Sequence, residues 1–320
     1  MEVFRFKRFE VRNELAAQKV GTDAVLLGAA LTLPDTTPQT AGDVQHLLDI
    51  GTGTGVIALM VAQRLADRIK SQGMSAEAPG KPSGTQPPFK ILAIDIDPAA
   101  ASEATANFAS SPWAPSLHAK ALSLNDLEKM TSCVEPAMPV LSPFTGEDGP
   151  FAGDTKVAES CERRECRLAD APGGQRPFPA RPDETHLFAA IFSNPPYFEA
   201  SLKAPDARRS TARHTDTLSY REICAFAASH LTPDGILSLI LPASEEQPLL
   251  RYAASFGLRP FRILRIRTTA RKPASRIIAE FRRTKTSSTP GDTIPAEELI
   301  LMSGTDRSPA YAALTKDFYL

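Results

Sequence analysis

The sequence predicts an α/β fold built on a mostly parallel β-sheet, and two observations support this prediction. Short apolar runs of strand character alternate with helical patterns through most of the chain. The central runs are almost continuously apolar, which is typical of strands that carry helices on both faces of a sheet. With 320 residues, 42% of them hydrophobic, the chain is long enough to bury a core of ordinary globular size.

The predicted elements follow one another in βαβ order, which favours parallel pairing. The last two strands are joined by a short loop containing the sequence KPAS, so we expect them to pair as an antiparallel hairpin. We expect strands at 46–50, 90–95, 187–193, 235–242, 261–268 and 276–283, and helices at 55–69, 98–108, 219–231 and 244–257.

Two stretches, 71–89 and 131–186, interrupt this pattern. Seven of the 19 residues in the first and thirteen of the 56 in the second are Pro or Gly, and their apolar residues follow no helix or strand period. We interpret both as disordered insertions within a single domain spanning 1–320. The rest of the chain, about 245 residues, fits one α/β domain.

Composition excludes several classes of protein. The net charge is −1, so any contact with nucleic acid requires a local basic patch. No apolar run is long enough to span a bilayer, and the N-terminus lacks the apolar region of a signal peptide. The four cysteines are too few and too irregularly spaced for a disulfide scaffold. We therefore expect a cytoplasmic protein without membrane contact, and a monomer.

The first chemical motif is the glycine-rich segment 49–55, DIGTGTG, between a predicted buried strand and a helix. The glycines Gly51, Gly53 and Gly55 allow a tight turn and a close approach of the backbone to a ligand. Val56 stands where the dinucleotide fingerprint requires its third glycine, so the motif indicates another nucleotide-like ligand, held by Asp49 and this turn.

The second predicted strand ends with two acids, Asp95 and Asp97. An acid at this point can accept hydrogen bonds from ribose hydroxyls, and we assign that role to Asp95. Asp97 precedes Pro98 and is expected to cap the next helix. In the segment HAKALSLNDL (118–127), where a third strand would end, Ser123, Asn125 and Asp126 are the polar candidates for a further cofactor contact, which stays unassigned.

Asn194-Pro195-Pro196-Tyr197 follows the apolar run 187–193 directly. Two prolines fix the backbone, so the Asn194 side-chain oxygen and the Pro195 carbonyl can both accept hydrogen bonds from one planar NH₂ group. Tyr197 offers a π face to the ring or amide that carries this group. Accepting both hydrogens builds electron density on the nitrogen as it attacks a methyl group, which stabilises the transition state without a general base.

Together these motifs resemble the class I, S-adenosylmethionine-dependent N-methyltransferases. Four further segments narrow the resemblance to the bacterial tRNA(Val) adenine N6-methyltransferase family, and it covers about 245 residues. The segments are FRFKRFEVRNELAAQKVGTDAVLLGAAL near the N-terminus, NPPYF with RRSTARH, RTTARKPASRIIAEFRR, and the terminal LTKDFYL.

The resemblance implies a Rossmann-like fold with a mostly parallel seven-stranded sheet and a C-terminal antiparallel hairpin. It also implies methylation of the adenine just 3′ of the anticodon, with S-adenosylmethionine held by 49–55 and Asp95 and the amino group held by 194–197. Lys19, Thr22 and Asp23 match the K-x-G-T-D segment of the family, which should lie over the methionine end of the cofactor. Neither insertion fits the compact family pattern.

Basic residues suggest where tRNA binds. The segment from Arg259 to Lys285 is strongly basic, and Arg265 and Arg267 alternate on one strand face, where they could hold phosphates on the solvent side. The loop from Lys203 to His214 follows the N-P-P-Y motif and could close over a flipped base. A solvated sheet face and an ordinary polar loop are the alternative interpretations.

A protein glutamine N5-methyltransferase is the main alternative, because a side-chain amide is also a planar conjugated NH₂ group. Only 48 residues precede Asp49, whereas enzymes of that type carry a helical substrate domain there, and the arginines favour RNA. A second alternative is an RNA-binding module that keeps the cofactor fold without its activity. That alternative predicts that motif residues are lost, but all of them are present. The scattered histidines and cysteines form no metal set, so we expect no metal.

Overall fold

The computed structural model describes residues 3–16, 19–35, 44–72, 88–132, 187–196, 218–284, 294 and 296–319. The two predicted insertions lie almost entirely outside this part of the chain, as do Tyr197, the loop 203–214 and Lys285. The edges of the insertions extend into regular elements. Ser71 ends helix α2 (Val56–Ser71), Phe89 begins strand β4 (Phe89–Asp95), and Thr131 belongs to helix α4 (Leu124–Ser132).

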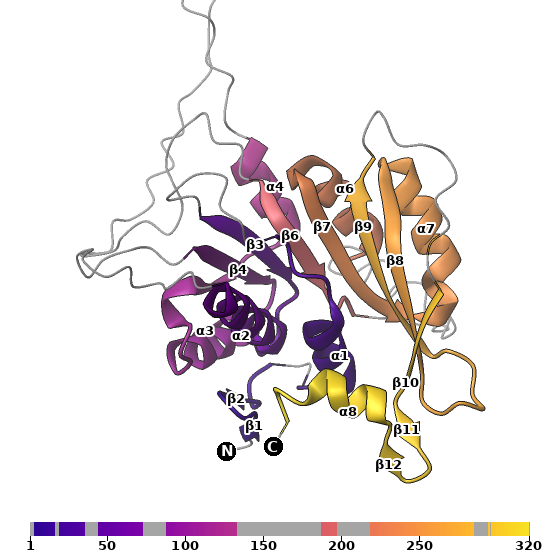
Figure 1. Ribbon diagram of the computed structural model, residues 1–320. Coiled ribbons are helices and arrows are strands. Elements are labelled where there is room, and N and C mark those ends of the chain that lie inside the picture. The colour runs from indigo at the N-terminus through magenta and orange to yellow at the C-terminus, as the bar shows by residue number, and fades with distance from the viewer. Residues whose placement is uncertain are drawn as a thin grey trace, which may run out of the picture. The chain divides into compact units, whose positions relative to one another are not determined.

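The main sheet has eight strands within the described residues, in the order β10-β8-β9-β7-β6-β3-β4-β5 (Figure 1). All neighbouring pairs are parallel except the two that β9 makes, so the expectation of a mostly parallel sheet with a C-terminal antiparallel hairpin, β8 with β9, is confirmed. The other strands are β3 (Gln45–Ile50), β5 (Leu117–Ala121), β6 (Phe188–Ser193), β7 (Leu231–Pro242), β8 (Leu258–Arg267), β9 (Arg276–Arg283) and β10 (Ala296–Ile300).

Helices cover both faces of this sheet (Figure 1). The central strands are apolar on both faces because each side chain meets a helix. Helices α1, α2 and α3 lie on one face, and α6 and α7 lie on the other. Their bounds are α1 (Thr22–Ala30), α3 (Pro98–Ala109), α6 (Tyr220–His230), α7 (Glu246–Ser255) and α8 (Pro309–Thr315), with short 3-10 turns η1 (Ala114–Ser116) and η2 (Ala243–Glu245).

The two ends of the described chain pack together around aromatic rings. The N-terminal hairpin β1 (Val3–Arg5) and β2 (Glu10–Arg12) carries Phe6, which stacks on Phe9 with centroids 4.4 Å apart and on Tyr319 with centroids 6.2 Å apart. A small hairpin, β11 (Met302–Ser303) with β12 (Asp306–Arg307), leads into α8. The N-terminal segment is thereby fixed beside the domain and not left as a tail.

Among the elements that periodicity did not predict, helix α1 and strand β10 were missed for different reasons. Helix α1 is buried along nearly its whole length, so it has no polar face to produce an amphipathic period. Strand β10 adds an eighth strand to the seven expected and pairs parallel with β8. Its sequence, AEELI, is too polar to be recognised as a strand.

Glu280 of β9 is the most heavily bonded buried acid in the described chain. Its side chain is fully buried, and its oxygens accept hydrogen bonds from the Thr32 amide at 2.6 Å and the Ser238 hydroxyl at 2.8 Å. The Thr32 hydroxyl donates at 2.7 Å and Arg262 at 2.8 Å. One carboxylate therefore joins the end of α1 to strands β7 and β8.

We predict that Glu280→Ala lowers the free energy of unfolding by about 3–5 kcal/mol, because it leaves several buried donors unpaired. Glu298→Ala is the matched control, since Glu298 pairs with Arg267 at 3.2 Å on the exposed edge and should cost less than about 1 kcal/mol. Urea denaturation measures both values. Equal losses would show that the Glu280 network contributes no more than a surface ion pair.

Candidate active site

The predicted site residues gather where three neighbouring parallel strands end. Ile50 of β3 is in register with Ile94 of β4 on one side and with Ser193 of β6 on the other. Adjacent strands lie about 4.8 Å apart, so the glycine turn after β3, the acid that ends β4 and the Asn-Pro-Pro segment after β6 share one edge. The strand order reverses direction between β3 and β6, and in open α/β sheets ligands bind at such a point.

The glycine turn has the backbone geometry that its sequence predicts. Gly51, Gly53 and Gly55 have φ values of 70°, 54° and 82°, a region that residues with a side chain rarely adopt. Gly55 has a second constraint, because a Cβ atom there would lie 2.5 Å from the ring of Phe108 on α3. The turn is therefore fixed by φ at three positions and by packing at one.

Asp49 is fully buried beneath this turn. Its Oδ2 accepts a hydrogen bond from the Thr52 hydroxyl at 2.7 Å, whereas its Oδ1 has no hydrogen-bond partner among the described residues. Burial is the main cause that raises the pKa of Asp49 to about 7; the Thr52 hydrogen bond opposes the shift and the nearby Asp95 adds to it. A buried acceptor without a partner fits a ligand that brings a cationic donor, as the ammonium group of S-adenosylmethionine would.

Asp95 has a role in the turn that the sequence did not indicate. Its Oδ2 accepts from the amide of Gly53 at 2.9 Å, and its Oδ1 accepts from the amide of Asp97 at 3.0 Å. A carboxylate can accept about four hydrogen bonds, so two positions stay available for ribose hydroxyls. Asp97 accepts from the Ala99 amide at 2.9 Å, which confirms it as the cap of α3.

Asn194 and Pro195 are buried at the end of β6, with Asn194 only 7% exposed, while Pro196 is exposed. The Ser193 hydroxyl donates to the carbonyl of Ile50 at 2.7 Å and so fixes the end of β6 against the start of the glycine turn. Ser193 was not among the predicted residues, because a serine at a strand end has no signal of its own. The roles assigned to Asn194, Pro195 and Pro196 stay predictions, as does that of Tyr197.

Lys19, Thr22 and Asp23 lie at the start of α1. Lys19 donates to the backbone carbonyl of Asn13, Thr22 is exposed, and Asp23 forms an ion pair with Arg276 at 2.8 Å. The segment that leads to them is tied to the glycine turn through Asn107 of α3, described further below. Their contact with a cofactor stays a prediction.

Two of the polar candidates that follow β5, Ser123 and Asp126, have a local role. Ser123 donates to Asp126 at 2.7 Å and accepts from the Asp126 amide at 3.1 Å, so the pair closes the first turn of α4. Asp126 is exposed, and it also accepts a hydrogen bond from the Lys129 ammonium group at 3.1 Å. These bonds account for both residues without a ligand.

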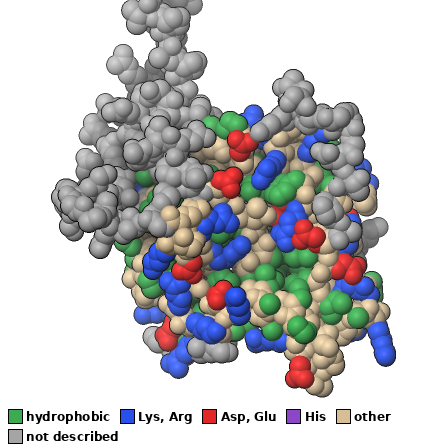
Figure 2. Space-filling model, in the orientation of Figure 1, with side chains coloured by type: hydrophobic (Ala, Val, Ile, Leu, Met, Phe, Trp, Pro, Cys, Tyr) green, Lys and Arg blue, Asp and Glu red, His purple; other side chains and the backbone are tan. Residues whose placement is uncertain are grey.

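Fewer basic side chains of the C-terminal segment 259–285 are available to a ligand than the sequence suggests. Arg265 and Arg267 do not stand free on solvent together, because Arg265 pairs with Glu246 at 2.5 Å and Arg267 with Glu298 at 3.2 Å. Glu246 of α7 and Glu298 of β10 supply these partners, 19 and 31 residues away from the arginines along the chain. Arg259, Arg271 and Lys272 are exposed and have no ion-pair partner among the described residues. On the face drawn in Figure 2, Lys and Arg alternate with Asp and Glu.

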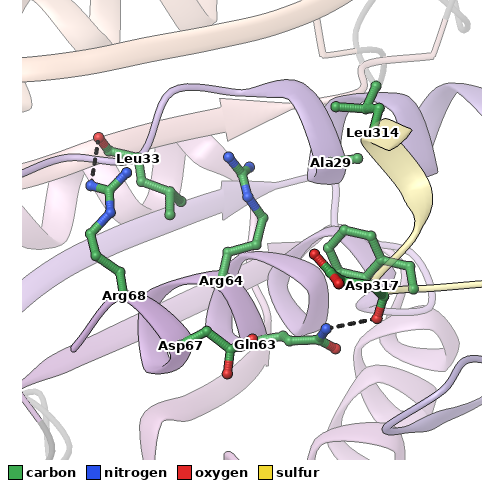
Figure 3. Close-up of a pocket in the computed structure, with 9 residues that line it drawn as sticks. Ala29, Leu33, Gln63, Arg64, Asp67, Arg68, Leu314 and Asp317 are labelled. Atoms are coloured by element: carbon green, nitrogen blue, oxygen red, sulfur yellow. Dashed lines mark hydrogen bonds between the residues drawn. The ribbon is translucent and has the colours of Figure 1, made fainter. Parts of the chain in front are cut away.

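A cavity of about 260 Å³ lies elsewhere, between α1, α2 and α8 (Figure 3). Arg64 and Arg68 line it, and they donate to backbone carbonyls of Gly28, Leu33 and Pro34 at and after the end of α1. Burial lowers the pKa of Arg64 to about 10. The cavity contains none of the predicted site residues; Arg64 bonds a carbonyl in the last turn of α1, and Arg68 bonds the segment that follows it.

The described residues include neither a membrane-spanning helix nor a metal-binding cluster. No helix there is long and apolar enough to cross a membrane. No cluster of three or more His, Cys, Asp and Glu side chains there is arranged to hold a metal ion.

Comparison with known proteins found close relatives along nearly the whole chain. A tRNA1(Val) (adenine(37)-N6)-methyltransferase of Photobacterium profundum is 32% identical over 99% of this chain and 98% of its own length. The protein of the same name from Porphyromonas gingivalis is 33% identical over 99% and 95%. No family model matches the chain.

Among solved structures, a ribosomal protein L11 methylase from Lactobacillus delbrueckii subsp. bulgaricus is similar to this chain at 13% identity. The match covers 86% of this chain and 84% of that one, with a TM-score of 0.40.

The state of Asp49 leads to a pH prediction. A cationic ligand favours the ionised carboxylate, so below pH 7 binding must first remove a proton, and affinity for S-adenosylmethionine should weaken by up to tenfold per pH unit. Calorimetry from pH 5.5 to 7.5 measures this slope. Asp49→Asn is the control and should bind weakly with little pH dependence. An equal slope in both proteins would rule out Asp49 as its source.

Proposed function

Because the chain belongs to the family of tRNA1(Val) (adenine(37)-N6)-methyltransferases, we propose that it methylates N6 of the adenine just 3′ of the anticodon in a tRNA(Val). The observation that supports this activity best is the placement of Asn194-Pro195-Pro196 beside the glycine turn, on adjacent strands. A group that can hold a planar amine thereby adjoins a group that can hold a nucleoside cofactor.

S-adenosylmethionine supplies an electrophilic methyl group on its sulfonium. Asp49, Asp95 and the turn with Gly51, Gly53 and Gly55 hold this cofactor, as the partnerless Oδ1 of Asp49 and the remaining acceptor capacity of Asp95 support. Lys19, Thr22 and Asp23 border its methionine end.

Asn194 and the carbonyl of Pro195 accept the two hydrogens of the adenine amine. The amine is a poor nucleophile because its lone pair is delocalised into the ring, and two acceptors return electron density to the nitrogen. The buried position of Asn194 strengthens these hydrogen bonds by excluding water. Tyr197 stacks on the base, a role that rests on the sequence motif alone.

An anticodon-loop adenine suits this site because it is already single-stranded, and turning it outward costs little compared with opening a duplex. The exposed residues Arg259, Arg271 and Lys272 are the best supported phosphate contacts within the basic segment 259–285. The loop 203–214 is a second candidate from the sequence. The enzyme acts as a cytoplasmic monomer, one domain with insertions at 71–89 and 131–186.

Asn194→Ala should reduce turnover by roughly 10²-fold or more while leaving tRNA binding largely intact, because its hydrogen bonds strengthen in the transition state. Transfer of a labelled methyl group to purified tRNA measures turnover, and filter binding measures affinity. Candidate protein substrates are tested in parallel. If the label enters a glutamine side chain and not N6-methyladenosine, the tRNA assignment is wrong. The protein is then a glutamine N5-methyltransferase.

The basic segment gives a separate prediction. Replacing both Arg271 and Lys272 with Ala should weaken tRNA binding and reduce the dependence of log affinity on log salt by about 1–2, since each phosphate contact releases counterions. Lys70 and Lys129, both replaced with Ala, form a control of equal charge on α2 and α4. If the two double variants lose the same affinity, net charge explains the effect and the segment makes no specific contact.

A further inference from the structure

Glu103, in the middle of α3, holds a turn of the N-terminal segment by its backbone. Its Oε1 accepts from the amides of Glu14 at 2.6 Å and Leu15 at 2.9 Å, and its Oε2 accepts from the amide of Ala16 at 2.8 Å. The side chain is 3% exposed. Three consecutive amides converging on one carboxylate form an anion-binding arrangement within the protein itself.

Glu103 stays ionised in this setting. Burial raises the pKa of Glu103, but the three amides and the nearby Lys19 together lower it below its usual value. Hydrophobic packing contributes little to holding the turn, because Leu15 at its centre is 60% exposed and only the small side chain of Ala16 is buried. The polar clamp fixes a piece of backbone that would otherwise gain little from being ordered.

Asn107 stands one helical turn beyond Glu103, on the same face of α3, and is fully buried. It accepts from the amide of Arg12 at 2.8 Å and donates to the carbonyl of Arg12 at 3.1 Å. It also donates to the carbonyl of Thr54 at 2.9 Å. One side chain thus joins the N-terminal segment to the glycine turn of the candidate site.

Asn13 closes the same segment on itself. Its side-chain oxygen accepts from the amide of Val20 at 3.0 Å, and its backbone carbonyl accepts from Lys19. Residues 13 and 20 are therefore held together, and the chain then enters α1 at Thr22. The contacts that hold the turn at Glu14 therefore also fix the positions of Lys19 and Thr22, which follow it in the chain.

We propose that Glu103 is a positioning residue for cofactor binding: it holds the turn at 14–16 against α3, so that Lys19, Thr22 and Asp23 are already in place for the cofactor. Glu103 itself touches no ligand. Its contribution is to order the segment before binding, which lowers the entropy cost of capture. The inference rests on the proposed function only through the cofactor and not through the tRNA.

The test compares Glu103→Ala, Glu103→Gln and the control Ser102→Ala, which changes an exposed residue of the same helix. Hydrogen exchange follows the amides of 12–20 and, as a measure of the core, those of 45–50. Calorimetry measures the affinity for S-adenosylmethionine without RNA. Turnover on tRNA is measured at saturating cofactor.

Glu103→Ala should lose protection at 12–20 but keep it at 45–50, and should weaken cofactor binding by about tenfold or more with turnover at saturation nearly unchanged. Glu103→Gln should fall between Glu103→Ala and the wild type, because its amide oxygen can still accept from Glu14 and Leu15 while its NH₂ group faces the amide of Ala16. If Glu103→Ala also loses protection at 45–50, its core is disturbed, and the comparison then relies on Glu103→Gln.

The proposal is wrong if the segment is released while cofactor affinity stays at the wild-type value. It is also wrong if 12–20 keeps its protection without Glu103, or if turnover falls and affinity does not. Failure of the tRNA assignment would look different, since the wild-type protein would bind S-adenosylmethionine and transfer no methyl group to tRNA.

Discussion

The turn between β3 and α2 contains three glycines in the left-handed region of backbone conformation, and the rest of the site depends on it. Its backbone leaves the strand at Ile50 and enters the helix at Val56, with positive φ at three glycines that lets it turn tightly and approach a ligand closely. Such a turn is entropically costly, and the structure fixes it from two sides. Asp95 accepts from the amide of Gly53, and Asn107 donates to the carbonyl of Thr54.

Hydrogen bonds to the glycine turn also hold the other parts of the site in place. The Ser193 hydroxyl bonds the carbonyl of Ile50, so the Asn-Pro-Pro segment and the glycine turn are aligned by a direct contact as well as by strand register. On the opposite side, Asn107 joins the turn to the N-terminal segment. In the proposed site, the strand ends would set the distance between the amine and the cofactor. A reaction that depends on in-line geometry benefits from such a fixed distance.

The sequence predicted the strands with continuous apolar runs, the β8–β9 hairpin and the capping role of Asp97, because each depends on residues close in the chain. It also placed the glycine turn and Asn194 at strand ends. It could not predict that Glu246 and Glu298 neutralise Arg265 and Arg267, or that Glu103 holds residues 14–16, because those partners lie on elements brought together only by folding. Helix α1 was missed because it is apolar and buried after its first two residues, so it shows no amphipathic period.

Methylation of an adenine amine in tRNA by the strand-end site can be measured in cells. Nucleoside mass spectrometry compares purified tRNA(Val) from cells that contain the gene with tRNA(Val) from cells that lack it. We expect N6-methyladenosine next to the anticodon in the first sample and unmodified adenosine in the second, restored by the wild-type gene but not by one carrying Asn194→Ala. Equal N6-methyladenosine in both samples would contradict the account.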